Sequence, residues 1–226
     1  MGVRVGDRIR PNGAMYYGTL GFFCQDNSGV IYLASCDHVI NSLAPFDGDN
    51  GEIYFNVGND YSLPIAEFTH QELVSESVRI ADFAIARVVI SVDSAVALPM
   101  KLPYSNISTF TGVCEPYNGG EVILWGARSC QYHSGVVLNS KSNYAWPHVR
   151  YGMISYEQQF SVAIDTSVIV DIGDSGGYVI DSNGRLMGII AALSGYMSKS
   201  GNAIIHCVPV ISCCKILNVS PIVGGR

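Results

Sequence analysis

Clusters of positive charge, long apolar runs and metal-type cysteine pairs are all missing from this sequence, and each absence excludes a class of protein. The formal net charge is −6 and lysines and arginines do not cluster, so we expect no nucleic-acid partner. No apolar run approaches the roughly 20 residues that a membrane-spanning helix requires, so no membrane partner is expected. Charged residues make up 14% of the chain and hydrophobic residues 48%, which indicates a folded globular protein and excludes a disordered one.

The cysteines are unlike those of a disulfide-rich or zinc-binding protein. There are seven of them, an odd number, none lies in a Cys-x-x-Cys pair, and Cys213 directly precedes Cys214. We interpret them as buried free thiols in a reducing compartment. The first residues, Met1 to Arg8, lack the apolar stretch of a secretory signal. The sequence therefore predicts a cytoplasmic protein with no metal and no other cofactor.

Short apolar runs separated by turns follow one another along the chain, and helix-length amphipathic segments are scarce. Tyrosine, valine and isoleucine, which favour strands, are plentiful. Turn sequences such as Asp26–Gly29 and Asp181–Gly184 separate the runs. This rhythm predicts an all-β protein built of closed barrels, with one short helix over 210–217. The predicted strands are 19–24, 30–34, 52–57, 63–68, 81–90, 121–125, 135–138, 160–164, 177–180, 186–193 and 203–208.

A stretch rich in proline, serine and asparagine interrupts the strand pattern at residues 99–119. We interpret it as a linker between two domains. The first domain, residues 1–98, and the second, residues 120–226 with the short helix at its end, would each form one β-barrel.

The stretch Asp171–Gly177, Asp-Ile-Gly-Asp-Ser-Gly-Gly, carries the strongest chemical signal. A serine between glycines needs a tight turn that exposes the backbone, and glycine permits both the turn and the close approach of a substrate. The amides of Gly173 and Ser175 could converge on one point and stabilise a developing oxyanion. Because Gly/Asp/Ser clusters also form ordinary turns, this motif alone leaves both interpretations open.

Two further residues complete a possible catalytic triad with Ser175. His38 follows a predicted strand, and Asp82 begins an apolar strand in which an unpaired carboxylate would be costly. The order His38, Asp82, Ser175, with gaps of 44 and 93 residues, is one of the known chain orders of serine-protease triads.

Other acids and histidines compete for these roles. Asp37 adjoins His38 and so points elsewhere, Asp93 lies beyond the strand, and Asp171 lies too near Ser175. The remaining histidines are interpreted as structural or surface residues; they are His70, His133, His148 and His206.

Four local segments resemble the trypsin-like (chymotrypsin-fold) serine proteases, and especially the intracellular bacterial members that lack a pro-segment. They are residues 33–39 (Leu-Ala-Ser-Cys-Asp-His-Val), 82–86 (Asp-Phe-Ala-Ile-Ala), 173–177 (Gly-Asp-Ser-Gly-Gly) and 184–190 (Gly-Arg-Leu-Met-Gly-Ile-Ile). The resemblance implies two six-stranded antiparallel β-barrels. It also implies that Ser175 attacks the scissile carbonyl, that His38 transfers the proton, and that Asp82 orients His38.

The chain departs from that family in two places. Trypsin-like zymogens are activated when a new Ile-Val-Gly-Gly amino terminus pairs with the acid before the nucleophile, and no such start exists here. Asp174 must therefore find another partner, or packing alone must hold the oxyanion loop. By resemblance, Ile169 and Val170 would form the base of the specificity pocket, although they could equally be core residues if the loop is built differently. No acid stands there, which favours a small or apolar P1 residue, although Asp171 could project inward and restore a basic preference. The pocket wall would consist of Ala191, Ala192 and Leu193.

Three functions are compatible with these residues. The first is a serine endopeptidase that cleaves a specific intracellular protein or peptide substrate. Its activity would be restricted by a narrow pocket, by an inhibitory protein partner or by the need for an activating one. The second is a binding module that keeps the protease fold without turnover. The third is an esterase, but the α/β-hydrolase type is disfavoured because its triad follows the order Ser, Asp, His and its serine precedes a helix.

Overall fold

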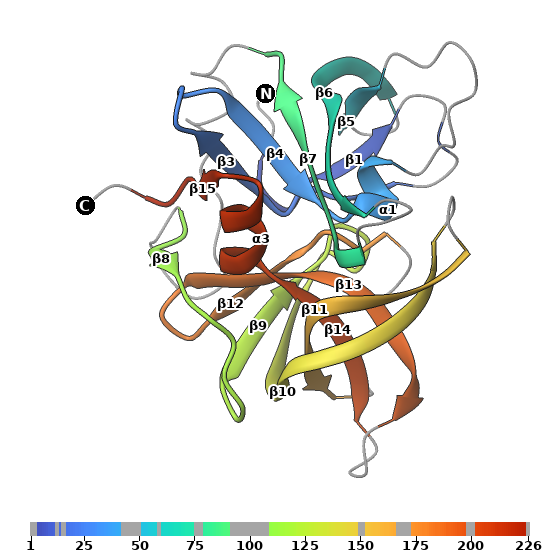
Figure 1. Cartoon of the computed structure of the whole chain (residues 1–226), viewed down its shortest axis with the longest axis vertical. Helices are drawn as coiled ribbons and strands as arrows, with labels where there is room; N and C mark the ends of the chain where they lie inside the picture. Colours follow the sequence, from blue (N-terminus) through green and yellow to red (C-terminus); the bar gives the residue numbers. More distant parts are fainter. Residues whose placement is uncertain are drawn as a thin grey trace.

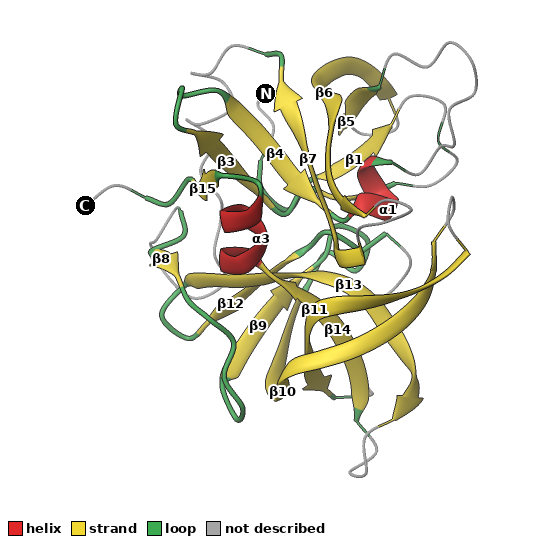
Figure 2. Ribbon diagram, viewed as in Figure 1, coloured by secondary structure: helices red, strands yellow, loops and turns green. Residues whose placement is uncertain are grey.

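The computed structural model describes residues 4–11, 14, 17–41, 51–57, 60–74, 79–90, 109–148, 152–165, 173–197 and 202–224. These residues form two β-sheets that lie one above the other, with two short helices (Figures 1 and 2). No helix in the described ranges is long and apolar enough to cross a membrane. The all-β class predicted from the sequence is confirmed.

The first sheet is a curved antiparallel sheet in the order β15-β3-β4-β7-β6-β5-β1-β2. Strand β2 lies at one end of this order and β3 lies next to the other end, yet only Leu20 and Gly21 separate them in the chain. A two-residue connection cannot span an open sheet, so the sheet must close on itself. Six strands form this barrel, and β2 and β15 add short edges to it. Their bounds are β1 (Arg8–Pro11), β2 (Gly18–Thr19), β3 (Phe22–Asp26), β4 (Ile31–Ser35), β5 (Glu52–Val57), β6 (Asp60–Val74), β7 (Arg79–Val88) and β15 (Val219–Pro221).

The second sheet is a barrel whose closure is explicit in its pairing. Its order is β12-β9-β10-β11-β14-β13-β8, and β12 also pairs with β13, which closes a ring of six antiparallel strands. Strand β8 joins the outside of β13 in parallel. The bounds are β8 (Gly112–Val113), β9 (Glu121–Trp125), β10 (Tyr132–His148), β11 (Gly152–Ile164), β12 (Tyr178–Asp181), β13 (Arg185–Met197) and β14 (Ala203–Pro209).

A continuous apolar core joins the two barrels. In the first barrel Phe22 and Phe83 stack with ring centroids 6.0 Å apart. The same cluster of buried side chains includes Tyr178 and Ile189 of the second barrel. Residues Ala81–Ala86 of β7 are buried without alternation, as expected for a strand covered on both faces. The boundary between the barrels is therefore a packed interior, and residues placed there are held rigidly.

Most predicted strands coincide with observed ones, and the predicted turns hold. Strands 52–57 and 121–125 match β5 and β9, and the predicted helix is α3 (Val210–Ile216). The Asp26 carboxylate closes the β3–β4 turn by accepting hydrogen bonds from the amides of Ser28 and Val30, at 2.8 and 2.9 Å.

The predicted linker and domain boundaries stay predictions, because residues 99–108 lie outside the described residues. In the described remainder, Gly112 and Val113 form β8 on the second barrel. After α3 the chain returns to the first barrel, where β15 pairs with β3, an exchange that the sequence did not indicate.

Strands β10 and β11 are much longer than predicted and extend past the second barrel as a two-stranded arm, residues 142–148 and 152–159 (Figure 1). On one face of the arm Ile154 and Tyr156 are buried, and Trp146 packs against them. Strand β11 packs against β7 of the first barrel. The arm therefore bridges the two barrels.

Candidate active site

His38 and Asp82 are brought together by neighbouring strands of the first barrel. Strand β4 ends at Ser35, and the one-turn helix α1 (Asp37–Ile40) follows and carries His38. Strand β7 pairs with β4 and carries Asp82. One oxygen of Asp82 accepts a hydrogen bond from the His38 amide at 3.1 Å, and the other lies 2.6 Å from Nδ1 of the His38 ring. This double contact fixes the ring and leaves Nε2 as the nitrogen away from the carboxylate.

The electrostatics of this pair favour a protonatable histidine. Burial lowers the pKa of His38, but the charge of Asp82, its hydrogen bond to the ring and the charge of Asp37 together raise the pKa above its ordinary value. The Asp37 carboxylate is fully buried and accepts a hydrogen bond from Asn41 at 3.5 Å. The charge of Asp37 is the smallest of the three influences that raise the pKa of His38. Asp93 and Asp171 lie outside the described residues.

Ser175 lies in a turn that only glycine can complete. Gly176 has φ +87°, and a Cβ there would lie 2.0 Å from Ser35 Oγ. A Cβ on Gly177 would lie 2.0 Å from the carbonyl oxygen of Trp125. Both positions exclude side chains, so the Gly-Gly that follows the serine is a packing requirement of the junction between the barrels.

The serine turn and the histidine turn meet at β13. The carbonyl of Ile190 accepts hydrogen bonds from the Gly176 amide at 2.8 Å and from the Cys36 thiol at 3.1 Å. The Ser175 hydroxyl donates to the next carbonyl, that of Ala191, at 3.3 Å. Within the described residues no hydrogen bond joins Ser175 to His38.

The amides expected to bind an oxyanion lie on a loop that is held by hydrogen bonds to residues outside the loop. Gly173 has φ +109°. Its carbonyl accepts a hydrogen bond at 2.9 Å from the buried Thr19 hydroxyl, which in turn accepts one at 3.0 Å from the Ala127 amide. The amides of Gly173 and Ser175 make no hydrogen bond within the part of the chain that the structure describes. The geometry leaves both donors available to a ligand.

The carboxylate of Asp174 accepts hydrogen bonds from backbone amides of the turn at residues 126–130. Its side chain is fully buried, and one oxygen accepts hydrogen bonds from the amides of Arg128 and Ser129 at 2.8 and 2.9 Å. Gly126 is required beside it, because a Cβ there would lie 2.1 Å from the same oxygen. The turn at residues 126–130 therefore holds Asp174 through backbone groups that exist as soon as the chain folds.

The predicted specificity pocket is only partly described. Ala191 and Ala192 are buried on β13, whereas the Leu193 side chain is 43% exposed. Ile169 and Val170 lie outside the described residues, and their assignment stays a prediction.

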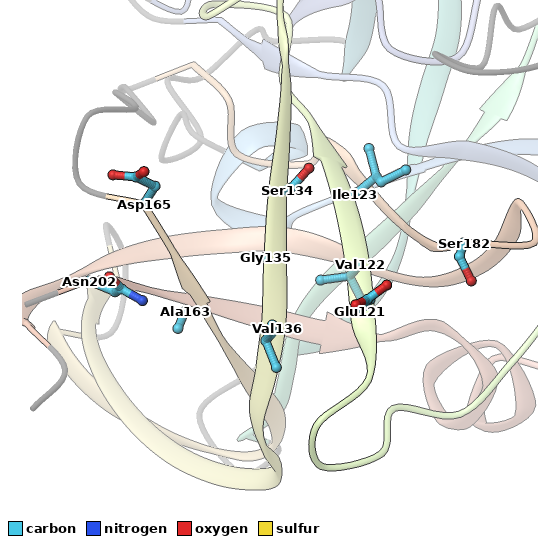
Figure 3. A pocket seen from close by; sticks show the side chains of 10 residues that line it. All are labelled: Glu121, Val122, Ile123, Ser134, Gly135, Val136, Ala163, Asp165, Ser182 and Asn202. Carbon is cyan, nitrogen blue, oxygen red and sulfur yellow. The ribbon is translucent and has the colours of Figure 1, made fainter. Parts of the chain in front are cut away.

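A surface cavity of about 550 Å³ lies elsewhere, on the wall of the second barrel (Figure 3). None of the candidate catalytic residues lines it. Its lining consists of Glu121, Val122, Ile123, Ser134, Gly135, Val136, Ala163, Asp165, Ser182 and Asn202.

One group of described side chains has the composition of a metal site, but its chemistry argues against one. Potential ligand atoms of Cys36, His38 and Asp82 lie within 4.8 Å of one another. His38 and Asp82 already bond to each other, and burial raises the pKa of Cys36 well above its ordinary value. The thiol therefore stays protonated, and metals bind the thiolate.

Of the other histidines, two have described side chains. His133 and His206 are buried in the second barrel, as structural residues would be.

Sequence reasoning missed Thr19, whose position beside Gly173 depends on contacts across 154 residues. No local pattern distinguishes Thr19 from other strand threonines.

The two closed barrels, with the candidate triad at their junction, are the architecture of chymotrypsin-like serine proteases, and the chain has this fold. A crystal structure of Thermobifida fusca protease A matches with a TM-score of 0.66 at 14% identity, covering 99% of this chain and 100% of the other. Cellulomonas bogoriensis chymotrypsin matches with a TM-score of 0.67 at 16% identity, covering 98% and 99%. A glutamic-acid-specific serine protease matches with a TM-score of 0.66 at 15% identity, covering 97% and 100%. No protein-family model matches this sequence, and neither does any curated protein.

Proposed function

We propose that this chain is a serine endopeptidase that uses His38, Asp82 and Ser175 as its catalytic triad. The observation that carries the proposal is the double contact between Asp82 and His38, at 3.1 and 2.6 Å, beside a glycine-enforced turn that presents Ser175. The chymotrypsin fold supports it, because that fold places the same three residue types at the same junction.

In the proposed mechanism the Ser175 hydroxyl rotates from the Ala191 carbonyl toward Nε2 of His38 and attacks the substrate carbonyl carbon. His38 accepts the hydroxyl proton, and the amides of Gly173 and Ser175 donate to the oxyanion that forms. His38 then gives its proton to the leaving amine, which departs and leaves an acyl-enzyme. Water, deprotonated by His38, then attacks the ester carbonyl. The ester bond to Ser175 Oγ breaks, His38 returns the proton to that oxygen, and the acid product leaves. Asp82 stays ionised throughout and stabilises the imidazolium.

The buried Ala191 and Ala192 and the partly exposed Leu193 support a preference for small or apolar P1 residues. We further propose cleavage of a specific partner in the cytosol. The cysteines support a reducing compartment, since all seven are free thiols. A protease active there needs restricted specificity or control by an inhibitory or activating protein.

One observation favours a second candidate, a latent protease-fold binding module. The Ser175 hydroxyl is bonded to Ala191, and no hydrogen bond within the described residues joins it to His38. A chain resting in that arrangement would bind a peptide along β13 without cleaving it until a partner realigns the serine.

A fluorophosphonate probe separates the two candidates, because it labels only a serine that a working base activates. We expect labelling of the native chain, loss of labelling in Ser175→Ala and His38→Ala, and normal labelling in Ser182→Ala, a matched change at an exposed serine in a turn. Labelled native protein then enters P1 profiling with peptide libraries. A folded native chain that is never labelled would refute the constitutive protease and leave the latent form.

A further inference from the structure

Tyr156, on the arm, is the feature that the proposed mechanism leaves unexplained. Its side chain is only 1% exposed, and within the described part of the chain its hydroxyl has no hydrogen-bond partner. A buried polar group without a partner costs about 1–3 kcal/mol. Phenylalanine would fill the same space without that cost, so the hydroxyl calls for a role.

The position of Tyr156 points to that role. Ile154 and Trp146 pack against it within the arm, and β11 packs on β7, the strand that carries Asp82. In Figure 1 the beginning of β7 lies between the two barrels, next to β11. The second barrel thus contributes a buried phenol on the strand that packs against the strand of Asp82.

The surroundings of the phenol are negative. Burial raises the pKa of Tyr156, and the charges of Asp82, Asp37 and Cys36 raise it further. The hydroxyl therefore keeps its proton at neutral pH and can only donate toward these groups.

We propose that Tyr156 is a positioning residue for the triad, whose hydroxyl donates a hydrogen bond, through one buried water, to the carboxylate of Asp82. The inference rests on the proposed function of the triad and adds a residue from the opposite barrel. The donated hydrogen bond weakens the attraction between the Asp82 charge and the His38 ring. It also holds the carboxylate in the orientation in which Asp82 contacts Nδ1 of His38.

The test is Tyr156→Phe, compared with Tyr144→Phe. Tyr144 is a matched control because it lies directly opposite Tyr156 on the arm, and its ring stacks on His206 instead. Without the phenol, His38 feels more of the Asp82 charge, so its pKa rises. We expect the acidic limb of kcat/KM to move to higher pH and kcat to fall about tenfold, the kinetic equivalent of one hydrogen bond to a charged group, with KM unchanged. Tyr144→Phe should change neither quantity.

The pKa of His38 is also measured by NMR titration of its imidazole protons, which requires no activity. A rise in Tyr156→Phe alone supports the inference even if the native chain proves inactive, in which case only the proposed function fails. An unchanged His38 pKa in a folded Tyr156→Phe variant overturns the inference, whatever happens to kcat. If that variant does not fold, 3,5-difluorotyrosine at position 156 keeps the hydroxyl and strengthens it as a donor. The His38 pKa should then fall, and no change would again overturn the inference.

Discussion

Replacing Asp174 should separate the stability of this protein from its catalytic competence. In Asp174→Ala the amides of Arg128 and Ser129 lose the oxygen that they reach at 2.8 and 2.9 Å. Each unpaired amide costs about 1–3 kcal/mol, and because both are only partly buried we expect a combined loss of about 2–4 kcal/mol. A native domain has a stability of about 5–15 kcal/mol, so the variant should fold.

The same replacement should reduce catalysis more than its effect on stability explains. Asp174 lies between Gly173 and Ser175, so a change in its anchorage moves the amides proposed to bind the oxyanion. Loss of one such donor costs about 10²–10³ in kcat. Asp174→Asn keeps an acceptor oxygen without its charge, and charge-assisted hydrogen bonds are about twice as strong as neutral ones. We therefore expect Asp174→Asn to fall between the native chain and Asp174→Ala in both measurements.

The assay combines urea denaturation with kcat per active site, counted by titration with a fluorophosphonate. Asp181 provides the control, since its side chain is also buried and one of its oxygens also accepts two backbone amides, those of Asn183 and Arg185 at 3.0 and 2.9 Å. Asp181→Ala should lower stability and leave kcat per folded molecule unchanged. The reasoning is refuted if Asp174→Ala keeps native kcat, or if Asp181→Ala loses as much.

Three further outcomes are expected. Because the pKa of His38 is raised and the mechanism needs a neutral ring, the acidic limb of kcat/KM should lie above the ordinary histidine value of about 6.5. Asp82→Asn should move that limb to lower pH and reduce kcat by about 10⁴, and a pH profile with an unmoved limb would contradict the pair. In the native protein iodoacetamide should modify the exposed Cys130 rapidly and the fully buried Cys36 only after unfolding. Mass spectrometry of timed samples measures both rates. Equal rates would be inconsistent with the packing of Cys36 against Ile190. Gly176→Ala should fail to fold, because its Cβ would lie 2.0 Å from Ser35 Oγ, and circular dichroism of a stable native-like variant would disprove the close approach.

The sequence predicted the parts of this molecule that depend on local patterns. Strand β4 has five consecutive buried residues, Ile31–Ser35, and such an apolar run between turns can be recognised without a structure. The motifs around His38, Asp82 and Ser175 were found because each is a short segment with an unusual composition.

The arm was not predicted, and the reason is physical. Only residues 135–138 and 160–164 of the β10–β11 hairpin were expected as strands, because they are its short apolar runs. Residues 152–157 of β11 alternate between buried and exposed, and β11 packs on β7 of the other barrel. Local periodicity carries no information about a surface that a distant segment supplies.

The supports of the catalytic loop escaped prediction for the same reason. Thr19 reaches Gly173 across 154 residues, and Asp174 reaches Arg128 across 46. Thr19 has no distinguishing neighbour in the sequence. Asp174 was recognised within its motif, but its partners at Arg128 and Ser129 were not. Prediction from sequence thus identified the proposed reacting residues and missed those that hold them in place.

The pairing of β15 with β3 has a consequence for the order of events during synthesis. Strand β3 is translated almost 200 residues before Val219–Pro221, the residues that cover its edge. Until then the first barrel keeps an uncovered edge, and the segment that contains Ser175 is also still to be translated for most of this time. The edge of β3 is therefore covered only after the whole second barrel, including Ser175, has been translated.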